Sequence, residues 1–204
     1  MAGVFFYDGT WTTEEPKIVG PMDHAFWLGS VIFDGGRAIK GWAPDLDRHC
    51  ARAVASAKAM LMKPTKTAAE IEALCREGIA RMGPDAELYI RPMFFIRKGL
   101  GAARPDPDST DFILSVYDAP LPAWAGFSAV MAPFRRPTPE MAPTDAKAAC
   151  LYPNGARASA GSPADRAGRP LYAPERRAGV ASRRHSRCRG GNRRIAGPRR
   201  GEPQ

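Results

Sequence analysis

The stretch Glu87–Arg97, ELYIRPMFFIR, is the strongest strand signal in this chain of 204 residues. Side chains in a strand point alternately to its two faces, so every second residue of the stretch shares a face. The set on one face is Tyr89, Arg91, Met93 and Phe95. Pro92 has no N–H to donate, which argues against a fully paired central strand. We therefore expect a strand whose N–H side is free at Pro92.

Further strands are expected on both sides of this stretch. Gly3–Tyr7 ends at Asp8-Gly9, from which Trp11–Thr13 returns as a hairpin. The other expected strands are Lys17–Gly20, a second hairpin over Arg37–Trp42, Asp111–Tyr117 and Phe127–Met131, with Leu100–Ser109 as a loop. The apolar run 24–33 is interpreted as a junction at which His24 and Trp27 face the core.

Two amphipathic helices are expected before the strong strand. Apolar residues repeat at spacings of three and four along Asp45–Met62, and Asp45 is placed to cap it. Thr67–Met82 begins with the capping box Thr67-Ala-Ala-Glu70, in which two side chains satisfy free backbone N–H groups. Strands packed by two such helices predict an α/β (α+β) layer architecture.

Charge is distributed unevenly along the chain, whose formal net charge is +9. Residues 1–156 carry 17 basic and 18 acidic side chains, a net of −1, whereas residues 157–204 carry 13 arginines, no lysine and 3 acidic residues, a net of +10. The basicity therefore belongs to the C-terminal segment. A nucleic-acid partner is not expected, because this segment has Tyr172 alone for stacking and no repeated aromatic or Arg-Gly-Gly pattern.

The chain is expected to divide into three parts. Residues 1–133 form an N-terminal lobe, residues 134–157 form a linker and the start of a second lobe, and residues 158–204 form a disordered Arg/Gly/Pro-rich tail. The tail lacks hydrophobic periodicity and cannot offset its ordering entropy. Arg, Ala, Gly and Pro have GC-rich codons, so we hypothesise that this segment is read out of frame, which the other two frames of the encoding DNA would test.

Cysteine usage and hydropathy exclude several classes of protein. The four cysteines are far apart in the sequence and form no Cys-x-x-Cys pair, so neither a metal site nor a disulfide framework is expected. No apolar run approaches the roughly 20 residues of a membrane helix, and no signal peptide is recognised at the N-terminus. The expectation is a soluble, cytoplasmic protein without a membrane partner.

Two basic residues are candidates for chemistry. Lys147 lies among small residues in Thr144–Tyr152, TDAKAACLY, with the phenol of Tyr152 five positions later. Arg52 lies near the apolar face of its helix, and a buried unpaired charge is costly, so it needs an anionic partner. A structural salt bridge is one way to supply that partner, and a bound anion is another.

Four motifs in order resemble the class IV aminotransferases, the fold type IV pyridoxal-phosphate enzymes, and look most like the branched-chain members. The first is the run 24–37, with His24-Ala25, Gly29 and then Phe33-Asp34-Gly35-Gly36-Arg37. The second is His49-x-x-Arg52 followed by Ser56-Ala57, the third is Tyr89-Ile90-Arg91-Pro92, and the fourth is Lys147 with Tyr152. The resemblance covers residues 3 to about 157 and implies the N-terminal lobe of that fold, with a mostly antiparallel sheet.

The resemblance implies pyridoxal 5′-phosphate (PLP) as cofactor and assigns a role to each site residue. Lys147 would form the Schiff base with PLP and act as the catalytic base, Tyr152 would donate to the cofactor's phenolic oxygen, and Arg52 would hold its phosphate. The substrate would be bound by Phe33, Tyr89 and Arg91, with Arg91 suited to the side-chain carboxylate of glutamate.

The activity implied is transamination of branched-chain L-amino acids with 2-oxoglutarate and glutamate as the amino partner, in a homodimer. Impaired turnover is expected of this chain, because the family's second lobe does not follow Lys147. Within the family, D-amino acid transaminase and aminodeoxychorismate lyase are alternatives. Outside it, the alternative is a nucleic-acid-binding or interaction protein acting through the Arg-rich tail.

Overall fold

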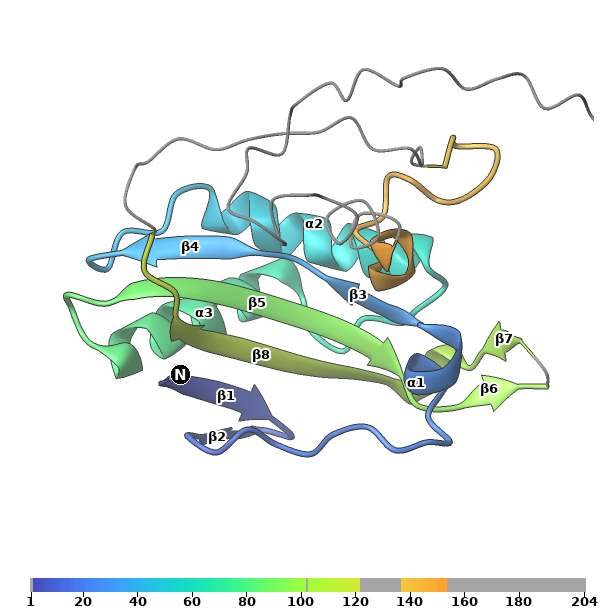
Figure 1. Ribbon diagram of the computed structural model, residues 1–204, viewed down its shortest axis with the longest axis horizontal. Helices are drawn as coiled ribbons and strands as arrows, with labels where there is room; N and C mark the ends of the chain where they lie inside the picture. Colours follow the sequence, from blue (N-terminus) through green and yellow to red (C-terminus); the bar gives the residue numbers. More distant parts are fainter. Residues whose placement is uncertain (1, 102, 122–136, 154–204) are drawn as a thin grey trace, which may run out of the picture. The chain divides into compact units, whose positions relative to one another are not determined.

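The computed structural model describes residues 2–101, 103–121 and 137–153, which contain one six-stranded sheet and a two-stranded ribbon (Figure 1). The strand order in the large sheet is β2-β1-β8-β5-β3, with β4 also paired to β5. Its strands are β1 (Gly3–Tyr7), β2 (Thr10–Thr12), β3 (Val31–Phe33), β4 (Gly36–Ile39), β5 (Glu87–Ile96) and β8 (Thr110–Asp118). The remaining elements are α1 (His24–Leu28), α2 (Leu46–Ala59), α3 (Ala68–Met82), the ribbon β6 (Gly99–Leu100) and β7 (Arg104–Pro105), and the 3-10 turns η1 (Pro107–Ser109) and η2 (Ala149–Leu151). Every pairing is antiparallel, as expected for this fold class.

β5 is the central strand of the sheet, which Pro92 did not predict, but the N–H side expected to be free at Pro92 is free of β3 and β4. It pairs with β8 from Leu88 to Ile96 on one side and with β3 and β4 on the other. Pro92 is tolerated there because it falls opposite the interruption between β3 and β4, and its carbonyl accepts a hydrogen bond from the Asp34 N–H at 3.0 Å. A missing donor is harmless where the neighbouring ladder is already interrupted.

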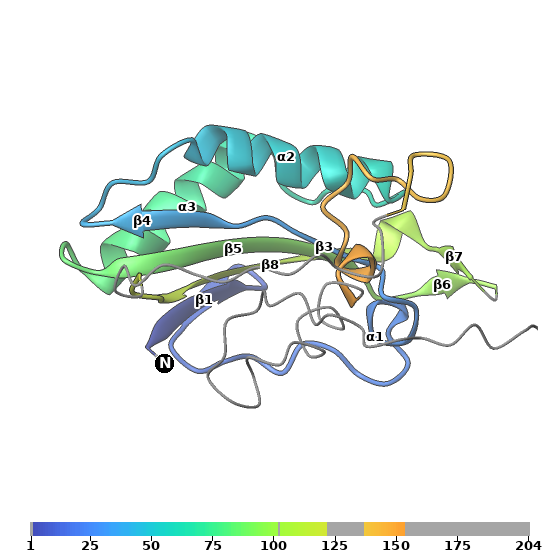
Figure 2. The ribbon, with the colours of Figure 1, turned by 45° about the horizontal axis from the view of Figure 1, so that its top comes forward.

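Helices α2 and α3 cover one face of the sheet (Figure 2). Ile32, Leu88, Ile90, Phe94, Leu114 and Val116 are buried beneath them. Gly78 lets α3 approach closely, because a Cβ at this position would lie 2.8 Å from side-chain atoms of both Trp11 and Val116. The burial pattern of β5 alternates as its sequence predicts, with Ile90 and Phe94 under the helices and Tyr89 and Arg91 on the other face.

The two helix starts differ. The predicted capping box of α3 is confirmed: Thr67 Oγ1 accepts from the Glu70 N–H at 3.3 Å, and Glu70 Oε2 accepts from the Thr67 N–H at 2.7 Å. Asp45 occupies the N-cap position of α2 as predicted, but its backbone is left-handed with φ of 51° and its side chain makes no capping hydrogen bond.

Several local expectations are wrong. Lys17–Gly20 is not a strand, since it pairs with no strand among the described residues. His24 is buried as expected, but Trp27 is 55% exposed, because α1 has only five residues and packs one side against β5. The hairpin expected over Arg37–Trp42 is confirmed only at its turn: Ile39 and Trp42 exchange backbone hydrogen bonds of 2.9 and 3.0 Å, while Gly36–Ile39 otherwise pairs with β5 as β4. The loop 100–109 contains the ribbon β6-β7, since Gly99 and Leu100 pair with Pro105 and Arg104.

Three sequence predictions lie outside the described residues. They are the strand Phe127–Met131, the domain boundary near residue 133 and the tail 158–204. The described part of the linker, residues 137–153, includes a segment that pairs with β3 through a bridge between Ile32 and Ala148.

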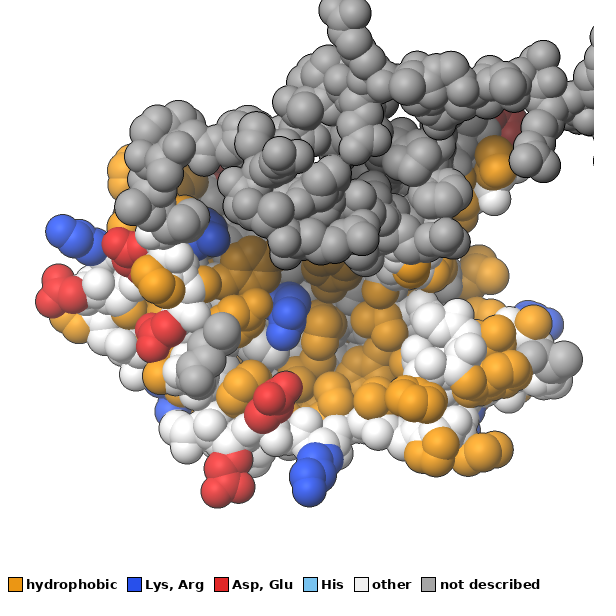
Figure 3. Space-filling view, in the orientation of Figure 1, with side chains coloured by type: hydrophobic (Ala, Val, Ile, Leu, Met, Phe, Trp, Pro, Cys, Tyr) orange, Lys and Arg blue, Asp and Glu red, His pale blue; other side chains and the backbone are white. Residues whose placement is uncertain are grey.

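The face of the sheet away from the helices, here called the open face, is the one in view in Figure 1. Many of its side chains are partly buried, among them Phe5, Phe33, Tyr89, Arg91 and Tyr117. Near α1 the same face carries a small second core, in which Phe95 and Ile113 are buried with Ala25. Hydrophobic side chains gather over it with few charged ones among them (Figure 3).

Candidate active site

The backbone of Lys147 is held from two sides. The Phe33 N–H donates to its carbonyl at 3.1 Å, and its own N–H donates to the Ser56 hydroxyl of α2 at 3.0 Å. Ala146 and Ala148 are buried on either side of it. Because side chains alternate along an extended segment, the Lys147 side chain points away from this buried side and lies with Phe33.

The Lys147 amine lies between two aromatic rings. Its Nζ is 3.0 Å from the Tyr152 hydroxyl and 4.4 Å from the centre of the Phe33 ring. The Phe33 and Tyr152 ring centres are 5.1 Å apart. The 3-10 turn η2 reverses the chain after Ala148 and so returns the phenol to the amine. The structure therefore brings together three residues predicted for the site, from β3 and the linker.

Arg52 of α2 has the anionic partner that its position demands. Its Nε donates to Asp34 Oδ2 at 2.6 Å and its Nη2 donates to Asp34 Oδ1 at 2.8 Å. The Asp34 side chain is fully buried, whereas that of Arg52 is 51% exposed. The bidentate pair leaves Nη1 of Arg52 outside it. The salt-bridge alternative is thus present, and half of the guanidinium side chain still faces solvent.

His49 completes this charged cluster, with its Nδ1 2.8 Å from Asp34 Oδ1 and 3.2 Å from Nη2 of Arg52. Burial by itself raises the pKa of the Asp34 carboxyl, but hydrogen bonds from Arg52, His49 and the Gly35 N–H outweigh it, and the pKa lies below its ordinary value. The hydrogen bond to Asp34 raises the pKa of Arg52, and the nearby Tyr152 adds to this shift.

Tyr89 and Arg91 lie on the open face along β5. The Tyr89 hydroxyl lies over Gly35, where an added Cβ would be 1.9 Å from it, so any larger residue would displace the phenol from its place. The Arg91 guanidinium lies 5.2 Å from the Tyr117 ring centre, and its buried Nε has no hydrogen-bond partner among the described residues. Phe5, Glu15, Arg91 and Tyr117 line a cavity of about 220 Å³ there.

Register relates these two residues to the Lys147 site. Phe33 pairs with Met93, which is two positions beyond Arg91 on the same face of β5. Two residues along a strand span about 7 Å. All five residues outside α2 that were predicted for the site, namely Phe33, Tyr89, Arg91, Lys147 and Tyr152, therefore belong to one side of the sheet.

Sequence reasoning assigned no role to Asp34, His49, Ser56 or Gly35. All four lie within the sequence motifs, so the motifs identified these positions but did not show which residues they contact. Ser56 could have been predicted to have a contact, because it is a polar residue at a buried position of α2 and a buried hydroxyl requires a hydrogen-bond partner. The partner proved to be the backbone of Lys147.

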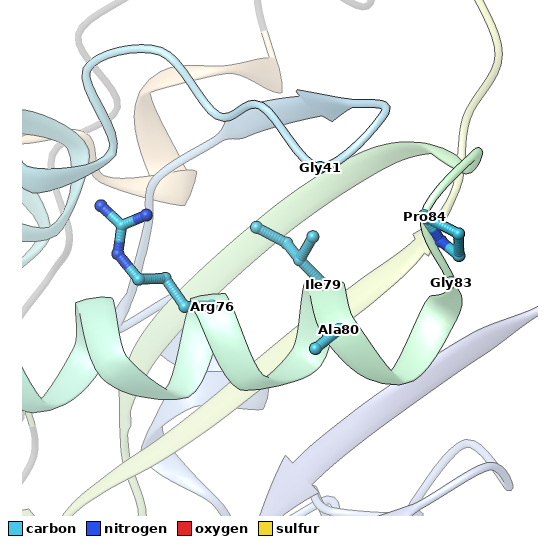
Figure 4. Close-up of a pocket in the computed structure, with 6 residues that line it drawn as sticks. All are labelled: Gly41, Arg76, Ile79, Ala80, Gly83 and Pro84. Carbon is cyan, nitrogen blue, oxygen red and sulfur yellow. The ribbon is translucent and has the colours of Figure 1, made fainter.

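A second cavity, of about 360 Å³, lies elsewhere in the lobe, between α3 and the turn at Gly41 (Figure 4). Arg76, its one charged lining residue, is already paired with Glu72. Within the described residues, no group of three or more His, Cys, Asp or Glu side chains could hold a metal ion. The same residues include no helix that is long and apolar enough to cross a membrane.

Comparison with known proteins gives concordant matches. A branched-chain-amino-acid aminotransferase of Escherichia coli strain K12 is 30% identical over 161 residues, which are 74% of this chain and 52% of that protein. The crystal structure of a Brucella abortus aminotransferase bound to the cofactor PLP matches with a TM-score of 0.74 and 46% identity, over 77% of this chain and 56% of the other. A Thermoproteus uzoniensis branched-chain aminotransferase with norvaline matches with a TM-score of 0.69 and 25% identity, over 81% and 57%.

The chain spans about half the length of the curated relatives it matches. The family model of amino-transferase class IV matches residues 31–167, a range that begins at β3 and includes Arg52, Tyr89, Arg91, Lys147 and Tyr152. The chain belongs to the class IV aminotransferases.

Proposed function

We propose that this chain provides the lysine-bearing half of the active site of a PLP-dependent aminotransferase for branched-chain L-amino acids, with 2-oxoglutarate and glutamate as the amino partner. The observation that carries the proposal is the Lys147 amine, set 3.0 Å from the Tyr152 hydroxyl and against the Phe33 ring. The chain spans about half of its curated relatives, so the complete activity is proposed for a protein that also has the remaining part, and turnover by this chain alone is expected to be weak.

The residues present fit PLP. A primary amine suits its aldehyde, a phenol suits its phenolic oxygen, aromatic rings suit its apolar surface, and a half-exposed guanidinium suits its phosphate. When bound, PLP withdraws electrons from the substrate Cα and so makes its proton acidic. Lys147 would hold the cofactor covalently and, once displaced by the substrate amine, move the proton of the Cα. Tyr152 would orient the cofactor through its hydroxyl, and Arg52 would bind the phosphate.

Substrate recognition is assigned to the open face. The Arg91 guanidinium is held against Tyr117 and has no ion pair among the described residues, although Glu15 lines the same cavity, so it is available to a carboxylate such as that of glutamate. Tyr89 would lie near the α-carboxylate, and Phe33 would supply an apolar wall for a branched side chain. These contacts support a site that takes both an apolar and a dicarboxylic substrate in turn.

We also propose that the full-length protein is a cytoplasmic homodimer. Phe26, Trp27 and Leu28 of α1 are exposed, as is Leu100 of the ribbon. Large apolar side chains that gather at a surface are typical of protein interfaces. A monomeric full-length protein, measured by light scattering, would contradict the dimer without touching the assignment of the site.

Covalent trapping tests the proposed function. We expect the purified chain to develop visible absorbance with PLP, and borohydride reduction followed by peptide mapping to place the cofactor on Lys147. Lys147→Ala should abolish the absorbance, whereas the matched control Lys58→Ala, which changes a lysine of α2, should retain it. Attachment of the cofactor to another lysine would refute the assignment of the site.

A further inference from the structure

The carboxylate of Asp34 is built into the point at which the sheet ladder is interrupted. It follows β3 directly, opposite Pro92, and its side chain is 0% exposed. Its oxygens accept two hydrogen bonds from Arg52, one from the Gly35 N–H at 2.7 Å, and one from His49 when Nδ1 of that ring carries the proton. A buried carboxylate with this many donors has a fixed orientation.

Arg52, in contrast, has an exposed side chain with many solvated rotamers open to it. The bidentate pair with Asp34 fixes both the position and the plane of its guanidinium. The pair uses Nε and Nη2, so the Nη1 edge is left for another anion. Tyr152, the partner of the Lys147 amine, lies close enough to interact electrostatically with the guanidinium.

We propose that Asp34 is a positioning residue, which holds Arg52 in the one orientation that binds the phosphate of the cofactor beside Lys147. The inference rests on the proposed function and deepens it. Asp34 touches neither cofactor nor substrate, and it acts through Arg52 alone. The carboxylate also balances much of the guanidinium charge, so the subsite would select a phosphate chiefly by the geometry of its hydrogen bonds.

Pyridoxal has the aldehyde of PLP but no phosphate, so comparing its affinity with that of PLP measures the contribution of the phosphate-binding residues. The dissociation constants of both aldehydes are measured by visible absorbance on the full chain and its variants. We expect Asp34→Asn, which keeps size but loses the charge, to weaken PLP binding by about tenfold, the scale of one lost charge-assisted hydrogen bond. Pyridoxal binding should be unchanged, and Asp34→Glu, which keeps a carboxylate, should recover part of the loss.

A double variant separates positioning from general destabilisation. If Asp34 acts through Arg52, then Asp34→Asn added to Arg52→Ala should produce no further loss of PLP affinity. The matched control is Asp111→Asn, which breaks a different ion pair, with Arg97, and should leave the ratio of the two affinities unchanged.

Two results overturn the proposal in distinguishable ways. Equal weakening of PLP and pyridoxal by Asp34→Asn, or additive losses in the double variant, would show that Asp34 only stabilises the fold, and the proposed function would stand. A wild-type chain that takes up neither aldehyde would refute the proposed function and this inference with it.

Discussion

The two faces of the sheet are made from the same strands but are closed in different ways. The face under α2 and α3 is filled by the chain's own side chains, with Ile90 and Phe94 fully buried. The open face carries Phe33, Tyr89 and Arg91, which are only partly covered by described residues. The difference predicts that the covered face contributes most to stability, and the proposed function assigns ligand binding to the open face.

Removal of a phenylalanine from each face should show the largest contrast. Phe94→Ala deletes a fully buried ring that packs 5.0 Å from the ring of Phe112, and we expect it to lower the free energy of unfolding by roughly 3–5 kcal/mol. Phe33→Ala should cost less, because its ring is partly exposed, and should instead weaken cofactor binding. Urea unfolding and PLP titration of both variants measure the two effects. Equal losses of stability would mean that the open face is also structural core.

Substituting alanine at two glycines, one at each face, should give a smaller difference in stability that separates the two faces more clearly. An added Cβ would meet Trp11 and Val116 at 2.8 Å from Gly78, and the Tyr89 hydroxyl at 1.9 Å from Gly35. Gly78→Ala should lower the free energy of unfolding by about 1–3 kcal/mol, because closely packed side chains cannot withdraw. Gly35→Ala should cost less stability, since the end of the Tyr89 side chain can swing away, but it should weaken binding of 2-oxoglutarate to the PLP-loaded protein. Thermal unfolding measures the loss of stability in each variant, and ligand titration measures the loss of binding. A larger loss of stability from Gly35→Ala than from Gly78→Ala would contradict the expectation.

The sequence predicted the covered face better than it predicted the site. Period-two alternation in β5 and the Thr67 capping box depend on neighbours within a few residues, and both were confirmed. The central position of β5 was not predicted. Pro92 is tolerated there because β3 and β4, more than 50 residues earlier in the chain, leave it unpaired on that side. Trp27 was misplaced, because a five-residue helix has too few turns for its apolar pattern to identify a buried side.

For the site, the sequence showed that Arg52 needs an anion but could not identify it. Asp34 lies 18 positions earlier, in the connection between β3 and β4, and no local spacing relates the two. The roles of Lys147, Tyr152, Phe33, Tyr89 and Arg91 came from resemblance to a family, and they remain predictions that the geometry supports.

The smallest expected effect concerns Asp34. Its buried carboxylate pairs with Arg52, so it links the covered face to the site. Its pKa in the folded protein lies below the ordinary value of 3.8, so the ionised form favours folding. This contribution is complete above the ordinary value and is lost as pH falls through the lower, folded-state pKa. Asp34→Asn cannot titrate, so the difference in unfolding free energy between wild type and Asp34→Asn should be greatest near neutrality and should shrink in acid. Urea midpoints between about pH 5 and about pH 2 measure the difference. A difference that stays constant across this range would mean that the carboxylate contributes size and hydrogen-bond geometry but not charge.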